Sequence, residues 1–333
     1  MKKLLLVTSA FERDHLFPDG LSSWINSIGH ECRLVEASDV QGFARTLTEY
    51  GPQVVIGGWD MPPLPLPALR AQGGSVDYLC FLCGSPKKQI GEEHLRAGLV
   101  LTNWGPWVGP YVAEGALLLV LSALRRVAKW GYQLRENGQW RERTTHNRSL
   151  YGKRVGIHGF GGIPRALTKL MAPFNPIIAT WDPFVSDEVL AAHGVERAAS
   201  VEALYTGSDV LVNLLPLTAE TERCVTEQLL RLLPEGACFV NNGRGQTVDE
   251  EALIKVAREG RIEVALDVYA REPLAKDSPL RTLPNVFLLP HMGGATIDRG
   301  RDCGQRALQN VERYLTGQAL ENRVDLPTFV RMT

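Results

Sequence analysis

The feature that most constrains the fold of this chain is a glycine-rich stretch at residues 155–165, with the sequence VGIHGFGGIPR. A short apolar run ends in glycines and leads into a helical pattern at 166–171, so the stretch predicts a strand, a tight turn and a helix. That order is typical of a dinucleotide site, because free N–H groups and the helix dipole favour an anion at a helix start. We expect Gly159 to make the turn and Gly161 to let the backbone approach a pyrophosphate.

The third glycine of the G-x-G-x-x-G pattern is replaced by Pro164. Proline is tolerated in the first turn of a helix, where its missing N–H has no partner to lose. Proline is bulkier than glycine where the helix packs against the strand, so the glycine pattern is incomplete at its third position.

An acidic residue stands at the distance that a dinucleotide site requires. Residues 177–181 predict the next strand, which ends at Asp182, 21 residues after Gly161. An acid about 20 residues after the glycines binds the ribose hydroxyls of the adenosine. No Arg or Lys follows in 183–184 to bind a 2′-phosphate, so the sequence favours NAD over NADP. The alternative is a glycine turn followed by a helix-capping Asp.

Composition places the chain among soluble globular proteins of about two domains. It has 333 residues, 44% of them hydrophobic and 22% charged, with a formal net charge of −1. Nucleic acids and anionic membranes are therefore not expected as partners. The apolar run at 4–7 is too short for a signal peptide, and the stretch at 113–124 is judged too short to span a bilayer.

The six cysteines are scattered through apolar segments. Cys80 and Cys83 have CxxC spacing but no second pair or nearby histidine to complete a zinc site, so no metal is expected. Buried reduced thiols fit a cytoplasmic protein.

Strand and helix signals alternate in two series. In residues 1–103, strands are expected at 4–7, 32–35, 54–56, 78–82 and 99–101, helices at 21–28, 42–48 and 92–97, and an extended surface loop at 61–67. A long helix is expected at 111–134. The second series has strands near 155–158, 177–181, 195–197, 210–214, 237–241, 262–266 and 286–289, and a last helix follows near 301–316. This rhythm predicts an α/β protein with two doubly wound parallel sheets.

The last helix is too isolated to form a domain alone, so we expect it to return to the N-terminal domain. The predicted domains are a discontinuous substrate domain, 1–103 with 293–333, and a nucleotide-binding domain, 104–292.

Polar residues gather after the strands of the second series, at Gly159, Asp182, Pro216, 241–244, Asp267 and His291. The carboxyl ends of parallel strands share one edge of a sheet, where ligands bind. Residues far apart in the sequence are thus expected to line one site.

The residues at this edge suit hydride-transfer chemistry. The proton transfer needs a group of the histidine type, so His291 is the candidate proton donor and acceptor. Glu272 could pair with it, fix its tautomer and favour its protonated form. Arg244 offers a planar fork for a carboxylate and a neighbouring carbonyl oxygen. Asp267 would support this arrangement or contact the nicotinamide amide. Taken singly, these residues also fit a capping Asp, a surface Glu, an exposed Arg and a structural His.

Several motifs in a fixed order resemble the D-2-hydroxyacid dehydrogenase family: PLTAET at 216–221, NNGRGQTVDEEAL at 241–253, ALDVY at 265–269 with EPL at 272–274, and PHMGGAT at 290–296. The resemblance covers about 150–300 closely, and the N-terminal part only by layout and by Val112-Ala113-Glu114. It implies a Rossmann coenzyme domain inserted into a flavodoxin-like substrate domain, and a homodimer built on the coenzyme domains.

The resemblance also implies roles for matching positions. Arg244 would bind a 2-oxo acid, His291 would be the acid in reduction and the base in oxidation, and Glu272 would be its partner. Gly84 and Ser85 would hold the substrate carboxylate through their amides. The expected NAD-binding residues are Gly159, Phe160, Gly161, Gly162, Ile163, Asp182, Leu215, Pro216, Gly243, Asp267 and Gly294.

Two departures leave the substrate open. The loop after Gly84 continues with Ser85, Pro86, Lys87 and Lys88, and Trp104 and Trp107 flank Gly105-Pro106. Solvated lysines with core tryptophans are one interpretation, and a pocket for a second anionic group is the other.

Three functions compete. The first is an NAD-dependent 2-oxo acid reductase, with glyoxylate or hydroxypyruvate as first substrates to test. The second is a phosphoglycerate dehydrogenase that binds phosphate through Lys87 and Lys88. The third is a non-catalytic NAD(H)-sensing protein similar to corepressor relatives of the family.

Overall fold

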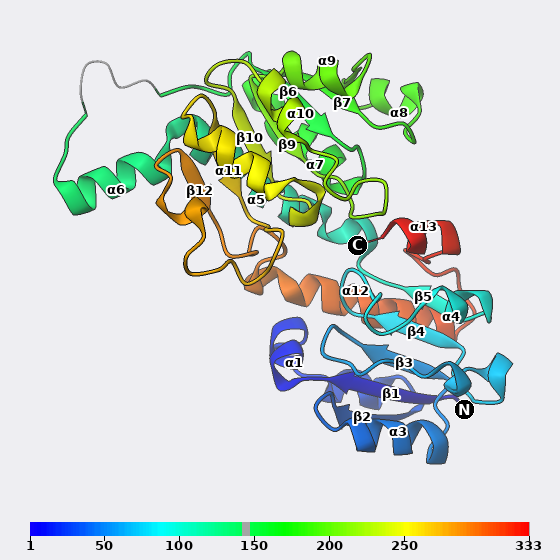
Figure 1. The fold of residues 1–333 in the computed structure, drawn as a ribbon. Coiled ribbons are helices and arrows are strands. Elements are labelled where there is room, and N and C mark those ends of the chain that lie inside the picture. The colour runs from blue at the N-terminus through cyan, green and yellow to red at the C-terminus, as the bar shows by residue number, and fades with distance from the viewer. Residues whose placement is uncertain (142–146, 333) are drawn as a thin grey trace. The chain divides into compact units, whose positions relative to one another are not determined.

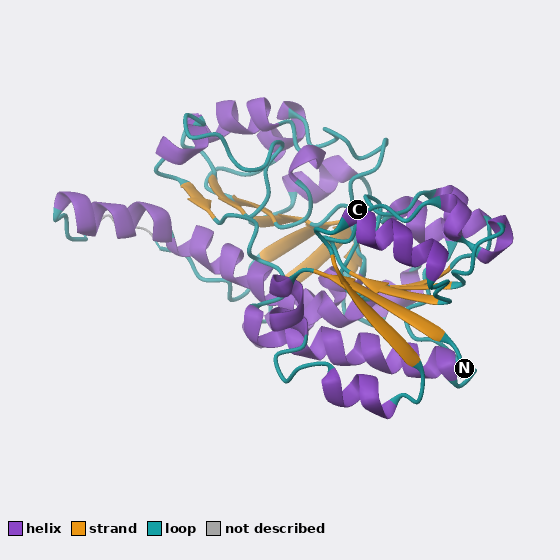
Figure 2. Cartoon of the chain, turned by 90° about the horizontal axis from the view of Figure 1, so that it is seen from below, coloured by secondary structure: helices purple, strands orange, loops and turns teal. Residues whose placement is uncertain are grey.

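The computed structural model describes residues 1–141 and 147–332 and divides them into two units. The first unit comprises Met1–Val108 and Thr296–Thr333, and the second comprises Gly109–Ala295. The sequence analysis placed the two crossings at 103/104 and 292/293, and the structure places them at 108/109 and 295/296. Each unit is an α/β sandwich with helices on both faces of its sheet (Figure 1; Figure 2).

The first unit has a five-stranded parallel sheet in the order β2-β1-β3-β4-β5, the flavodoxin-like order. Its strands are β1 (Lys3–Thr8), β2 (Glu31–Glu36), β3 (Val54–Gly57), β4 (Tyr78–Phe81) and β5 (Val100–Thr102). Its helices are α1 (Ala10–Leu16), α2 (Ser22–Ser27), α3 (Val40–Glu49), α4 (Glu92–Arg96), α12 (Ile297–Leu315) and α13 (Leu326–Arg331). Strands β3 and β4 are buried along their whole length, because helices cover both faces of the sheet.

The last long helix, α12, packs against α1 and β4 of the first unit. The Sγ of Cys80 in β4 donates to the carbonyl of Ala307 in α12, 3.4 Å away. Tyr78 and Tyr314 have their ring centroids 4.6 Å apart. The C-terminal helix thus completes the core of the N-terminal sheet.

The second unit has a seven-stranded parallel sheet in the order β12-β11-β10-β9-β6-β7-β8, a Rossmann arrangement with one added strand. The strands are β6 (Arg154–His158), β7 (Ile177–Trp181), β8 (Glu196–Arg197), β9 (Val210–Asn213), β10 (Cys238–Asn241), β11 (Glu263–Leu266) and β12 (Val286–Leu288). The helices are α5 (Gly109–Arg125), α6 (Val127–Asn137), α7 (Gly162–Met171), α8 (Asp187–Ala191), α9 (Val201–Thr206), α10 (Glu227–Leu232) and α11 (Glu250–Arg258).

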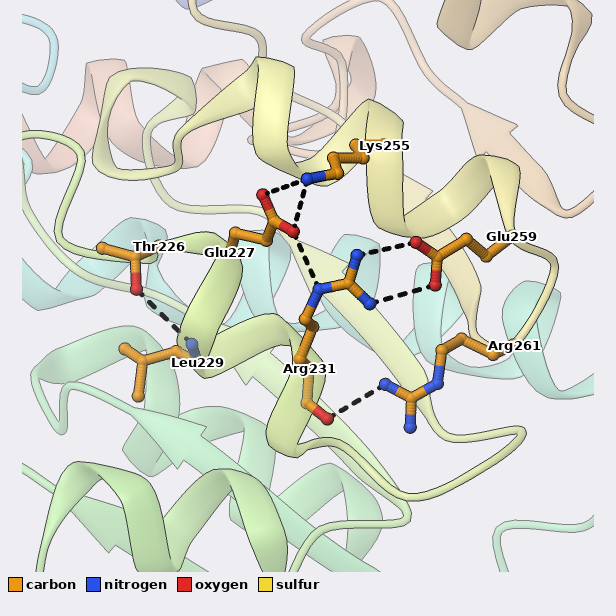
Figure 3. A network of polar contacts seen from close by, with 7 residues as sticks. All are labelled: Thr226, Glu227, Leu229, Arg231, Lys255, Glu259 and Arg261. Carbon is orange, nitrogen blue, oxygen red and sulfur yellow. Dashed lines mark hydrogen bonds and ion pairs between the residues drawn. The ribbon is translucent and has the colours of Figure 1, made fainter.

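Two apolar clusters flank this sheet. Helices α5 and α7 cover one face, and α9, α10 and α11 cover the other. An exposed network of ion pairs joins α10 to α11 (Figure 3): Arg231 binds Glu259 at 2.7 Å, and Lys255 binds Glu227 at 2.8 Å. The network fixes the two helices on the outside of their cluster.

The expected helix at 111–134 is two helices. The chain changes direction at Arg126, whose φ of 52° is left-handed, and α6 then runs out from the second unit (Figure 1). The guanidinium of Arg126 forms a 2.7 Å ion pair with the buried carboxylate of Glu263. This interaction with the start of β11 holds the chain in a conformation that the local sequence does not favour.

By length and composition, the helical stretch Gly105–Arg125 is long enough to cross a membrane, so the judgement that this region is too short was wrong. In the structure α5 packs against β10, β11 and α7. Its apolar side chains therefore cover the sheet of the second unit.

Three further expectations are corrected. The segment at 61–67 is not simply a surface loop, because Met61 and Leu64 are each only 2% exposed. Helix α1 was missed although Ser9 and Glu12 form a capping box that the sequence displays. Helix α13 was also missed.

The six cysteines are all free, and four of them are buried, namely Cys80, Cys83, Cys238 and Cys303. No group of His, Cys, Asp and Glu side chains suited to a metal ion occurs among the described residues.

Candidate active site in the nucleotide-binding unit

The turn between β6 and α7 is shaped for a phosphate. Gly159 has a φ of 87°, which glycine adopts without strain, and α7 begins at Gly162. The N–H groups of the first helical turn have no partner within the helix. A Cβ at Gly161 would meet no atom within 4 Å, so a ligand can approach this backbone closely.

Pro164 lies in the first turn of α7 and is buried there. A helix leaves the N–H at this position unpaired, so proline removes no hydrogen bond. The missing third glycine therefore does not disturb the strand–turn–helix arrangement.

Asp182 follows β7 and supports the glycine turn. Its Oδ2 accepts from the Phe160 N–H at 2.7 Å, and its Oδ1 accepts from the Phe184 N–H at 2.8 Å. The sequence analysis found no cation after this acid, but β8 brings one: Arg197 donates to the Asp182 carbonyl at 3.0 Å and pairs with Asp187 at 2.5 Å.

The residues that follow β9 and β10 lie close to the glycine turn. A Cβ at Gly159 would lie 3.3 Å from Leu215, and one at Gly243 would lie 3.0 Å from the Leu215 carbonyl. Pro216 follows and is exposed. The structure thus brings together several of the predicted NAD-binding residues at one edge of the sheet.

His291 and Glu272 form a pair. Nδ1 of His291 is 2.6 Å from Oε2 of Glu272, and the other carboxylate oxygen accepts from the Tyr269 N–H at 3.0 Å. The hydrogen bond to the Glu272 carboxylate holds a proton on Nδ1 of His291, and Nε2 is then the nitrogen that can contact other partners. The His291 side chain is 50% exposed, so Nε2 is accessible to a small molecule.

Asp267 fixes the backbone that carries His291. Its Oδ1 accepts from the N–H groups of Met292 and Gly293, at 2.8 and 3.0 Å, and its carbonyl accepts from the His291 N–H at 2.9 Å. These bonds hold His291 at a φ of 53°, a left-handed conformation that is costly outside glycine. Gly294 follows, and a Cβ there would meet no atom within 4 Å.

Arg244 lies at the end of β10 and is largely buried. Burial lowers the pKa of its guanidinium, and the charge of nearby Glu272 acts in the opposite direction. Its Nη1 donates to the Gly243 carbonyl at 2.8 Å. The three candidate catalytic side chains, Arg244, Glu272 and His291, therefore come from neighbouring strand ends of one unit.

A buried amide network under Arg244 was missed by the sequence analysis. Asn241 Nδ2 and Thr247 Oγ1 donate to the Arg244 carbonyl, at 3.2 and 2.7 Å, and Asn213 donates to Thr247 at 2.8 Å. One sequence feature could have predicted this network, namely the asparagine that ends each of the buried strands β9 and β10. A buried amide without a hydrogen-bond partner is costly, so such residues are expected to pair.

Gly84 and Ser85 lie in the first unit, in the loop after β4. Within the described residues neither backbone N–H donates a hydrogen bond, and the Gly84 carbonyl accepts from Asn103 Nδ2 at 2.6 Å. Adjacent free amides at the carboxyl edge of a sheet suit an anion. Their expected role toward a substrate carboxylate stays a prediction.

Lys87 contacts the C-terminal helix of the first unit. Its Nζ donates to the Val330 carbonyl of α13 at 2.9 Å and lies over the Phe329 ring. The lysine thus anchors the C-terminal helix on the loop that carries Gly84.

Comparison with known proteins decides the family. Residues 117–293, just over half of the chain, match the family model described as "D-isomer specific 2-hydroxyacid dehydrogenase, NAD binding domain". The chain belongs to the D-2-hydroxyacid dehydrogenase family. The second unit is its NAD-binding domain, and the glycine turn, the acid after β7 and the free amides of α7 fit that cofactor.

Curated relatives of this family carry different activities in their names. A glyoxylate reductase of Thermococcus kodakarensis is 34% identical over 235 residues, which cover 68% of this chain and 70% of that protein. A D-3-phosphoglycerate dehydrogenase of Methanocaldococcus jannaschii is 32% identical over 237 residues, 71% of this chain but only 45% of that protein. The chain therefore spans less than half the length of some dehydrogenases that it matches.

Solved structures share the fold over nearly the whole chain. A glyoxylate reductase from Paecilomyes thermophila superposes with a TM-score of 0.81 at 23% identity, over 97% of this chain and 98% of that one. A D-isomer specific 2-hydroxyacid dehydrogenase from Xanthobacter autotrophicus Py2, in complex with NADPH and MES, gives 0.76 at 26% identity over 99% of this chain and 100% of that one. Both units therefore have the arrangement known in this dehydrogenase family.

Proposed function

We propose that this dehydrogenase interconverts a 2-oxo acid and a D-2-hydroxy acid, acting mainly as a reductase. The observation that carries the proposal is the 2.6 Å contact between His291 Nδ1 and Glu272. It leaves Nε2 as the nitrogen for proton transfer at the edge of the sheet where Arg244 also lies. General acids in this position contribute about 10²- to 10⁴-fold to the rate.

In the proposed reduction, Arg244 binds the 2-oxo acid through its guanidinium fork and polarises the carbonyl. Reduced NAD, when bound, supplies the hydride that the carbonyl carbon accepts. The proton on Nε2 of His291 passes to the carbonyl oxygen, so that C=O becomes CH–OH. Glu272 keeps the imidazole oriented and compensates its charge before the proton leaves. We assign the two free amides of Gly84 and Ser85 to the substrate carboxylate.

We propose NAD as the preferred coenzyme because the Asp182 carboxylate would repel a 2′-phosphate. The charge of Arg197 acts against this preference, and Asp187 pairs with that charge. Comparing NADH with NADPH in wild type and in an Asp182→Ala variant tests the assignment. We expect the variant to lose most of the preference, and wild-type turnover that is equal with both coenzymes would contradict the role of Asp182.

The test of the mechanism is an His291→Ala variant assayed with NADH and a panel of 2-oxo acids that includes glyoxylate and hydroxypyruvate. We expect kcat to fall about 10³-fold while the dissociation constant of NADH, measured by fluorescence, stays unchanged. His30→Ala, a histidine on the first unit, is the matched control. Turnover of His291→Ala close to wild type would overturn the mechanism.

The same panel separates the two rival functions. Turnover of 3-phosphohydroxypyruvate alone would favour the phosphoglycerate dehydrogenase, in which Lys87 would have to share its ammonium between the Val330 carbonyl and the phosphate. Tight NADH binding without turnover of any 2-oxo acid would favour the NAD(H)-sensing protein.

We further propose that the enzyme is a homodimer that associates through α6. None of the residues of this helix is buried, and Tyr132 and Leu134 are 60% and 52% exposed. A helix with exposed apolar side chains that runs out from its unit is typical of an interface between subunits. A second copy of the chain is the occupant that the family resemblance implies.

A further inference from the structure

Two indole rings stand at the carboxyl edge of the first unit's sheet and are not used by the proposed function. Trp59 follows β3, and Trp104 follows β5. Their ring centroids lie 5.2 Å apart with the planes at 73°, an edge-to-face contact. Trp59 is 54% exposed, so part of its ring is accessible to a ligand.

Trp59 borders the loop with the free amides. A Cβ built at Gly84 would lie 4.0 Å from Cζ2 of Trp59. The main chain of Trp104 is bound to the same loop, since its N–H donates to the Cys83 carbonyl at 3.1 Å. An anion held by the Gly84 and Ser85 amides would therefore lie beside the indole of Trp59.

The loop that carries Trp59 is fixed from two sides. The buried side chain of Gln89 donates to the Trp59 carbonyl at 2.9 Å. The buried carboxylate of Glu12 accepts from the Asp60 N–H at 3.2 Å. The exposed ring thus stands on a rigid backbone, which is the arrangement that a selective wall requires.

The charges beside Trp59 do not suit a second anion on the ligand. Asp60 is the next residue, and its Oδ2 accepts from the Ser9 hydroxyl at 2.5 Å. The nearest lysine in the sequence of the loop, Lys87, is bound to the carbonyl of Val330. The charge of Asp60 opposes the binding of a phosphate or a second carboxylate in this place.

We propose that the substrate is a 2-oxo acid with an aromatic side chain, and that Trp59 is the wall against which this side chain stacks. Trp104 supports the Trp59 ring from the side. The inference rests on the proposed function, because it takes the reaction to be the reduction of a 2-oxo acid whose carboxylate binds at Gly84 and Ser85. Offset or edge-to-face contacts between aromatic rings supply the selectivity.

The experiment compares kcat/KM for phenylpyruvate, pyruvate, glyoxylate and 3-phosphohydroxypyruvate in the wild type, Trp59→Ala, Trp59→Phe and Trp24→Ala. We expect the wild type to prefer phenylpyruvate over glyoxylate at least about tenfold. Trp59→Ala should lose about 10- to 100-fold on phenylpyruvate, mostly through KM, and less than about threefold on glyoxylate. Trp59→Phe should recover most of the loss, because it keeps an aromatic face.

Trp24→Ala is the matched control, since Trp24 lies in α2 and its indole N–H donates to Glu312. It should leave the order of the substrates unchanged. A wild type that prefers glyoxylate, or a Trp59→Ala variant that loses activity equally on all substrates, would overturn this inference and leave the reductase function standing. No turnover with any 2-oxo acid would instead overturn the proposed function.

Discussion

Asp267 shows how one buried side chain prepares the residue beside it for chemistry. It is 2% exposed, and its hydrogen bonds to the backbone at 291–293 impose the left-handed conformation of His291. A conformation of this kind costs about 1–3 kcal/mol for a residue other than glycine, so it persists only where the surroundings impose it. The sequence analysis weighed support of the site against contact with the nicotinamide for this residue. The structure displays the support, and the contact with the nicotinamide stays a prediction.

His158 provides a prediction about pH. It ends β6 and is 6% exposed, and burial lowers its pKa to about 4. The unfolded chain binds a proton near pH 6.5 and the folded chain does not, so the second unit should lose stability as the pH falls from 6.5 toward 4. The loss should approach about 1.4 kcal/mol per pH unit in this range.

Thermal unfolding at pH 7.5 and at pH 5 checks this prediction. His158→Gln should reduce the difference between the two melting temperatures, while the control His30→Gln, at a half-buried histidine of the first unit, should keep it. An equal pH dependence in wild type and His158→Gln would show that another group is responsible.

At the scale of the element, the join between α5 and α6 depends on one ion pair. Arg126 neutralises Glu263, whose side chain is 8% exposed and whose pKa burial raises. Arg126→Gly keeps the left-handed backbone favourable and removes only the cation. We expect it to lower the free energy of unfolding by about 2–3 kcal/mol, because a buried carboxylate is left unpaired.

The sign of the pH effect identifies the cause of this loss. A carboxyl group whose pKa is raised in the folded state makes the protein less stable as the pH rises. The substitution Arg126→Gly should therefore lower the free energy of unfolding more at pH 8 than at pH 5. Adding Glu263→Gln should restore part of the stability and remove that difference in denaturant unfolding. A double variant as unstable as Arg126→Gly alone would contradict the ion-pair explanation.

Pro164 gives a prediction about the first turn of α7. Replacing it by Gly would restore the third glycine of the motif. Because proline costs no hydrogen bond there, we expect the dissociation constant of NADH to change less than about threefold. Stability should fall by about 1–2 kcal/mol, since glycine raises the conformational entropy of the unfolded chain and loses the buried ring of Pro164. A tenfold change in NADH affinity would show that the ring of Pro164 contacts the cofactor.

The strands were the most predictable elements, and the connections between elements were the least predictable. All twelve strands of the described residues were expected near their observed positions, because most of them are apolar runs bounded by turn residues. The break at Arg126 could not be predicted, since it depends on Glu263, more than 100 residues away. The Arg197 contact at Asp182 was missed although only 15 residues separate the two, because it depends on the pairing of β8 with β7. The pairing of His291 with Glu272 was predicted and is observed at 2.6 Å. Their catalytic roles stay predictions, as does a cytoplasmic location.

At the scale of the whole molecule, the proposed dimer gives the remaining prediction. The wild type should sediment as a dimer, and Tyr132→Glu combined with Leu134→Glu in α6 should sediment as a monomer, because charges on two sides of this helix oppose its burial. Val40→Glu is the matched control, since Val40 is 58% exposed in the first unit. A monomeric wild type, or a doubly substituted chain that still sediments as a dimer, would contradict the proposal.

The return of α12 to the first unit also has a consequence for synthesis of the protein. A ribosome releases the strands of the first sheet long before it makes Ala307 and Tyr314, which pack on Cys80 and Tyr78. The intervening residues, Gly109–Ala295, form a unit with its own two apolar clusters. The nascent chain is thus expected to complete its nucleotide-binding unit first. Until α12 has been synthesised, one apolar face of the N-terminal sheet stays uncovered, and a chaperone would recognise this face.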